Sequence, residues 1–198
     1  MSTLDTDVYA TRTTQAPAHE QFVRRWSPRA MSGQALTMEE LRTLVEAARW
    51  APSCFNSQPW RFIYGLRGTE AFDRLFGVLM DMNQTWAQNA GAVLAIVSRN
   101  TFEHNGKPAP THSFDTGSAW MNLALQAQHM GLVAHAMWGF EHADAPGVLG
   151  LDDQHEVQAM VAIGHPGQRD DLPEPYNERE VPSPRKDLDE ILFEGKLG

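Results

Sequence analysis

The sequence predicts a single domain in which helices cover a central β-sheet on both faces. Helix-like and strand-like segments alternate along the 198 residues, and one strand-like run, residues 92–98, is continuously apolar. Such a run is typical of a strand that is covered on both faces. The length allows a substantial core, and 42% hydrophobic residues is ordinary for a globular protein.

Capping signals and apolar stripes predict the helices. The clearest helix start is a capping box of Thr37 and Glu40, and the helix that follows this box is stopped by Pro52. Further helices are expected at residues 19–26, 69–80 and 115–130.

Period-two alternation and short apolar runs predict about five strands. The expected strands are residues 60–66, 92–98, 132–138, 156–164 and, in the tail, 190–193. The tail before the last of these is proline-rich and therefore extended. An extended tail that ends in an apolar strand needs a surface to pair with, which a second subunit can supply.

The composition excludes several classes of partner. A net charge of −9 argues against nucleic acid or an anionic membrane as the main partner. Residues 116–140 carry no charge, but polar side chains interrupt them, so a buried helix and strand are expected there rather than a membrane span.

The N-terminal sequence and the lone cysteine suggest a cytoplasmic protein. Cys54 is the single cysteine, which fits a reducing compartment, and the N-terminus has no apolar signal-peptide core. We expect residues 1–18 to form a mobile N-terminal arm and residues 19–198 to form one domain.

The first candidate site is the string "RRWSPR", in which Arg24, Arg25 and Arg29 surround Ser27. Arginine forks and hydroxyl groups suit phosphate oxygens. A solvated basic turn is the alternative.

A second candidate is "APSCFNSQPW", residues 51–60. Asn56 and Gln58 offer amide donors and acceptors that could bind the edge of a polar ring, whereas the alternative is a packed structural loop. Cys54 has no base beside it in sequence, so a nucleophilic role has weak support.

Two further strings are candidates. Arg185 and Lys186 follow prolines late in the chain, where a surface turn is the alternative. Gly139, after Trp138, ends a predicted strand, where ligands often bind and where a glycine lets backbone approach a flat ligand; an ordinary turn is the alternative.

No metal site is expected. The eight histidines show no HExxH or comparable spacing, and His129 and His135 are interpreted as core residues. No phosphate-binding glycine loop is present either.

From about Phe22 to the C-terminus, the chain resembles the FMN-dependent nitroreductase family. The resemblance rests on "RRWSPRAM" and "LVEAARWAPSCFNSQPWRFI" at their spacing, and then on "DTGSAWMNLALQAQHMGLVAHAMWGF" and "VPSPRKDLDEILFEG". It implies an α+β sandwich, a nitroreductase-like α/β/α arrangement around a mostly antiparallel sheet. It also implies an intertwined homodimer with FMN at the interface and C-terminal tails exchanged between subunits.

The resemblance assigns roles to individual positions. Those implied to bind the FMN phosphate or adjoin it are Arg25, Trp26, Ser27, Arg185 and Lys186. Arg29 would reach the flavin N1/O2 edge and Asn83 its pyrimidine end, while the backbone of Trp138 and Gly139 would face flavin N5. The loop residues implied to line the flavin are Pro52, Ser53, Cys54 and Asn56.

Three positions depart from the family pattern. Cys54 stands where many members have serine, and Trp86 stands where some have lysine. Asp187 stands where proline is common. Without that lysine, Arg29 becomes the main expected cation for the reduced flavin ring.

The resemblance implies a ping-pong oxidoreductase. NADH or NADPH would reduce bound FMN, and an electron-poor small molecule, such as a nitroaromatic, a quinone or an enal, would then be reduced. No side-chain acid or base is clearly required. The alternatives are an FMN carrier or sensor without turnover, and a structural interaction domain without a cofactor. We expect residues 66–86 and 100–114 to border the pocket mouth.

Overall fold

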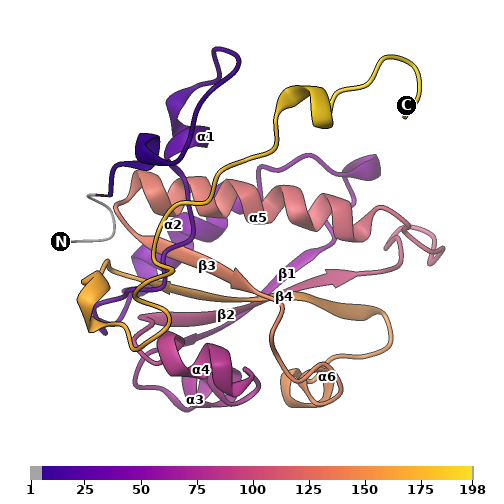
Figure 1. Cartoon of the computed structure of the whole chain (residues 1–198). Helices are drawn as coiled ribbons and strands as arrows, with labels where there is room; N and C mark the ends of the chain where they lie inside the picture. The colour runs from indigo at the N-terminus through magenta and orange to yellow at the C-terminus, as the bar shows by residue number, and fades with distance from the viewer. Residues whose placement is uncertain (1–5, 198) are drawn as a thin grey trace.

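The computed structural model describes residues 6–197. Four strands form one antiparallel sheet in the order β1-β2-β4-β3 (Figure 1). The strands are β1 (Trp60–Leu66), β2 (Ala92–Arg99), β3 (Val133–Met137) and β4 (His155–Gly164). β2 is buried at every position except its last, as its continuous apolar sequence predicts.

Helices cover both faces of the sheet (Figure 1). On one face, α2 (Met38–Ala48) and α5 (His112–His129) enclose a core that includes Leu44, Ile96 and Leu123. On the other face lie α3 (Glu70–Gly77), α4 (Asp81–Ala87) and α6 (Ala145–Leu149), whose core includes Phe72, Trp86 and Met160. The predicted α+β sandwich around a mostly antiparallel sheet is confirmed.

The capping box at α2 is also confirmed. The Thr37 hydroxyl accepts a hydrogen bond from the Glu40 N–H at 3.2 Å, and the Glu40 carboxylate accepts one from the Thr37 N–H at 2.8 Å. The cap starts a helix that buries Leu41, Leu44 and Ala48 against the sheet.

Residues 69–80 do not form the single helix that was predicted. α3 ends at Gly77 because the next residues bond to the segment after β3: Glu141 N–H donates to the Val78 carbonyl and Met80 N–H to the Gly139 carbonyl. α4 then begins at Asp81. Tertiary hydrogen bonds therefore override the local helix pattern.

The predicted fifth strand is absent from the described chain. Residues near 190–193 instead form the short 3₁₀ helix η5 (Leu188–Glu190) and a turn. The other short helices are α1 (Glu20–Arg24), η2 (Val8–Ala10), η3 (Cys54–Asn56) and η4 (Arg169–Asp171). The tail carrying η5 projects past α5 rather than pairing with the sheet (Figure 1).

The arm and the tail contact one another. Within residues 6–18, Val8 and Arg12 are buried, and the Thr11 hydroxyl donates to the Pro182 carbonyl at 2.8 Å. The first five residues of the predicted mobile arm lie outside the described residues, and mobility of residues 6–18 stays a prediction. Within residues 6–197, no helix is both long and apolar enough to cross a membrane.

The two histidines predicted to lie in the core differ. His135 is half-buried, and its Nδ1 lies 3.1 Å from the Pro28 carbonyl oxygen. His129 is exposed because it occupies the solvent side of the last turn of α5, so its predicted burial was wrong.

Candidate functional site

The turn after β3 and the start of α4 lock together at Gly139. The Gly139 carbonyl accepts hydrogen bonds from the Met80 N–H at 3.1 Å and from the Asn83 amide nitrogen at 2.8 Å. A Cβ at position 139 would lie 2.6 Å from that nitrogen, so a larger residue there would displace the Asn83 amide. Trp138 beside it is 68% exposed, which leaves this turn open to a ligand.

Asn83 is oriented from both ends of its amide. Its oxygen accepts a hydrogen bond from the Trp86 ring nitrogen at 3.2 Å, while its nitrogen donates to Gly139. The Trp86 ring is buried and packs 4.7 Å, centre to centre, from the His135 ring. Trp86 is therefore a core residue that fixes Asn83.

A buried carboxylate holds Arg29. Glu180 Oε1 accepts from the backbone N–H groups of Arg29 at 2.6 Å and Ala30 at 2.9 Å, and its other oxygen lies 3.7 Å from the Arg29 guanidinium. Burial raises the pKa of Glu180, against the opposing effect of these backbone donors. The Arg29 guanidinium also lies 5.9 Å from the ring centres of both Trp86 and Tyr176, which restrict it further.

Arginines from three segments gather near Ser27. Arg25 donates to the Ser27 hydroxyl at 3.2 Å, and its Nε is buried without a partner in the described structure. Burial and then Arg185 lower the pKa of Arg25, whereas burial, Arg185 and Arg25 lower that of Arg12. The charged neighbours acting on Arg12 and Arg25 are thus other arginines. This arrangement suits an anion.

Arg24 does not join this arginine cluster. It is exposed and forms an ion pair with Glu20 at 2.9 Å, one turn earlier in α1. The sequence motif groups Arg24 with Arg25 and Arg29, but in the structure the Arg24 side chain pairs with Glu20 at the surface.

The loop Pro52–Asn56 has a strained backbone. Phe55 and Asn56 each have φ of 52°, and Gln58 has 46°, values that residues other than glycine seldom adopt. The buried Asp115 of α5 anchors the loop by accepting from the Cys54 N–H at 3.1 Å. Such strain is typical of functional sites.

The structure brings some predicted site residues together within one chain. Arg25 and Ser27 form one group with the nearby Arg185, and Asn83 contacts Gly139 while Trp86 lies between Asn83 and Arg29. The loop is bonded to α5 through Cys54 instead, and Trp26 borders a pocket beside Val8, Ala124 and Leu132. Lys186 is exposed.

Sequence reasoning missed the supporting roles of four residues, namely Arg12, Asp115, His135 and Glu180. The role missed for His135 is its hydrogen bond to the Pro28 carbonyl. Each of these four residues bonds to backbone far away in the sequence. For Asp115 alone, the sequence held a weak signal of a supporting role, because its helix has no Lys or Arg to pair with it. Within residues 6–197, no group of three or more candidate metal-ligating side chains is found.

The fold and site together define a sandwich protein with an exposed glycine turn and with clustered arginines, an arrangement suited to an anion. The model of the nitroreductase family matches residues 23–76 and 69–165, and the chain belongs to that family.

Individual relatives agree with this assignment. A solved structure described as an oxidoreductase containing FMN is 43% identical with a TM-score of 0.90, covering 94% of this chain and 96% of that one. An uncharacterized 15.4 kDa protein of Mycolicibacterium smegmatis is 31% identical over 147 residues, 70% of this chain and 97% of its own length. A Streptococcus pyogenes protein named "Putative NAD(P)H nitroreductase Spy0809" is 22% identical, covering 85% of this chain and 94% of its own.

Proposed function

We propose that this protein is an FMN-dependent oxidoreductase that takes electrons from NADH or NADPH and reduces an electron-poor small molecule. The observation that carries the proposal is the arginine cluster, in which the buried Arg25 Nε has no partner and the charged neighbours of Arg25 and Arg12 are arginines. A terminal phosphate monoester supplies the missing acceptor and charge. The FMN-containing relative supports this choice of cofactor.

The residues present fit FMN along its length. Arg25 and Ser27, with Arg185 and Lys186, would hold the phosphate. Arg29, held by Glu180, would supply positive charge at the N1/O2 edge. Asn83 would face the pyrimidine end.

The turn at Gly139 would face the reactive edge of the ring. Within the described residues its N–H donates no backbone hydrogen bond, so the group is available to a ligand. When bound, FMN supplies the redox chemistry, accepting a hydride from the nicotinamide and passing it to the acceptor. The chain's task is to bind, orient and stabilise charge.

The proposal includes a homodimer. Within one chain, the loop that carries Pro52, Ser53, Cys54 and Asn56 is bonded to α5 through the Cys54 N–H. In the proposed dimer, a second copy would bring this loop to the flavin. Exposed apolar side chains on the tail support such an interface, namely Leu188, Ile191, Leu192, Phe193 and Leu197. The single cysteine favours a cytoplasmic location.

Steady-state kinetics test the proposed enzyme. Because nicotinamide and acceptor would use one site in turn, initial-rate plots at several acceptor concentrations should give parallel lines. Nitrobenzoates and quinones are suitable acceptors. Intersecting lines would contradict the shared site, and no acceptor-dependent NAD(P)H oxidation would favour the carrier or sensor alternative.

The phosphate assignment has its own test. Each charge-assisted hydrogen bond contributes about 1.5–3 kcal/mol, so replacing Arg25 and Arg185 together by alanine should weaken FMN binding by orders of magnitude. Equilibrium titration of the apoprotein measures the loss. Unchanged FMN affinity would refute the assignment.

A further inference from the structure

Arg12 of the N-terminal arm is buried, with 8% of its surface exposed. Its guanidinium donates hydrogen bonds to the carbonyl oxygens of Val23, of Arg25 at 2.9 Å and of Ser183 at 2.9 Å. Three backbone acceptors for one side chain define its position closely.

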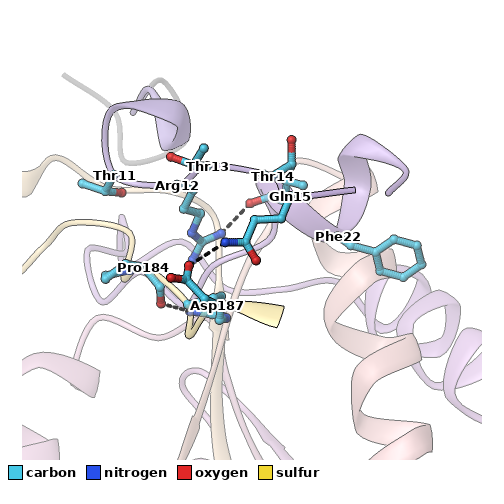
Figure 2. Close-up of a pocket in the computed structure, with 10 residues that line it drawn as sticks. Thr11, Arg12, Thr13, Thr14, Gln15, Phe22, Pro184 and Asp187 are labelled. Atoms are coloured by element: carbon cyan, nitrogen blue, oxygen red, sulfur yellow. Dashed lines mark hydrogen bonds between the residues drawn. The ribbon is translucent and has the colours of Figure 1, made fainter. Parts of the chain in front are cut away.

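These three carbonyls belong to two segments that are far apart in sequence. Val23 and Arg25 lie at the end of α1, directly before Ser27, whereas Ser183 lies in the tail two residues before Arg185. Figure 2 shows Arg12 between the arm and the tail, with Pro184 and Asp187 on the tail side. Arg12 therefore joins the two segments that carry the proposed phosphate ligands.

The electrostatics of this junction are unfavourable without an anion. Burial, then Arg185 and then Arg25, lower the pKa of Arg12. The acidic side chain that lines the same pocket, Asp187, accepts a hydrogen bond from Gln15 at 2.7 Å rather than from an arginine. Buried arginines are seldom left without an anionic partner, so a ligand with negative charge would stabilise the arrangement.

We propose that Arg12 is a positioning residue of the FMN phosphate site, an inference that rests on the proposed function. Its hydrogen bonds hold the Arg25–Ser27 segment against the Arg185 segment, and its charge adds to the attraction for a phosphate monoester. The N-terminal arm is thus part of the cofactor site.

Riboflavin, which lacks the phosphate, separates this role from a general structural one. Dissociation constants for FMN and riboflavin are measured on the full-length apoprotein by flavin fluorescence, for wild type, Arg12→Gln, Arg12→Lys and Arg24→Gln. Arg12→Gln should weaken FMN binding on the order of 10- to 100-fold and leave riboflavin binding unchanged. Arg12→Lys keeps the charge but cannot reach all three carbonyls, so its FMN loss should be smaller. The matched control, Arg24→Gln, alters an exposed arginine of the same region and should change neither constant.

Equal losses for FMN and riboflavin in Arg12→Gln, or unchanged FMN affinity, would overturn the role of Arg12. If Arg12→Gln does not fold, as judged by circular dichroism, the Lys variant decides by the same ratio of FMN to riboflavin affinity. A wild-type protein that binds FMN no more tightly than riboflavin would instead refute the phosphate site itself, and with it the proposed function.

Discussion

Arg29 is restrained by groups from two separate parts of the chain, Trp86 in α4 and the segment that carries Tyr176 and Glu180. Glu180 accepts a hydrogen bond from the Arg29 N–H, and its other carboxylate oxygen lies 3.7 Å from the Arg29 guanidinium. The guanidinium also lies 5.9 Å from the ring centre of Trp86 and 5.9 Å from that of Tyr176. Such restraint preorganises the cation, so little reorganisation is needed when negative charge develops on a bound ring.

Replacing Arg29 should make the bound flavin harder to reduce. Reduction leaves negative charge near N1/O2, so a differential interaction of about 1.4 kcal/mol corresponds to about 30 mV for two electrons. Dye-equilibration potentiometry should show a shift of this size to lower potential in Arg29→Gln and a smaller one in Arg29→Lys. Arg42→Gln, on the exposed side of α2, is the control. Normal FMN binding at an unshifted potential would show that Arg29 is not the N1/O2 cation.

At the scale of elements, the tail is attached at its start and apolar at its end. The arm binds the start through Thr11 to Pro182, and Gln15 bonds both Asp187 and the Leu188 N–H. Beyond η5, by contrast, Ile191 and Leu192 are 59% and 75% exposed. Apolar side chains this exposed are typical of a segment that packs on another subunit.

Removing residues 181–198 should therefore abolish both the proposed dimer and FMN binding. The truncation deletes Arg185 and Lys186 and the apolar surface of the tail, while it retains Glu180 to hold Arg29. Light scattering after size exclusion, with the flavin-to-protein ratio, measures both losses. A shorter truncation of residues 195–198 removes only Leu197 of the exposed apolar tail residues and should stay dimeric and yellow. A flavin-loaded monomer lacking residues 181–198 would contradict the proposed assembly.

The sequence predicts those elements whose signals are local. The capping box at Thr37 and the apolar run of β2 are readable because each depends on neighbours in the chain. α4 and the break at Gly77 are not readable, since they depend on hydrogen bonds to residues 139–141. α6 spans too few residues for helical periodicity to be recognised.

The same distinction applies to the site. Arg25 and Ser27 are neighbours in one motif, and their side chains are hydrogen-bonded in the structure, while their role toward a phosphate stays a prediction. Glu180 and Arg12 were missed because each bonds to a residue more than 150 positions away, 151 for Arg29 and 171 for Ser183. Each also stands among ordinary surface residues in the sequence, so composition gave no signal.

At the scale of the whole molecule, His135 links the sheet to the arginine segment. From β3 it packs on Trp86 and donates its Nδ1 hydrogen to the Pro28 carbonyl in its neutral form. Burial and then the charge of Arg29 lower the pKa of His135 from 6.5 to about 4. The folded protein therefore holds this histidine neutral at a pH where the unfolded chain would protonate it.

Because the pKa of His135 is lower in the folded than in the unfolded state, the free energy of unfolding falls as the pH is lowered. The contribution of His135 is fully present above about pH 6.5 and is lost as pH falls toward about 4, because the unfolded state binds the extra proton. The loss is at most about 3 kcal/mol. Urea unfolding of wild type and His135→Gln between these pH values should give free energies of unfolding whose difference shrinks as pH falls. A constant difference would contradict the predicted protonation.

The central claim is that this chain passes electrons through FMN, and an anaerobic half-reaction tests it most directly. The FMN-loaded protein is mixed with NADH or NADPH in a stopped-flow instrument, and the visible flavin absorbance is followed. We predict that one or both nicotinamides bleach the absorbance, and that a nitroaromatic or quinone added without oxygen then restores it. Bound FMN that stays oxidised with both nicotinamides would contradict the account and leave a flavin carrier or sensor in its place.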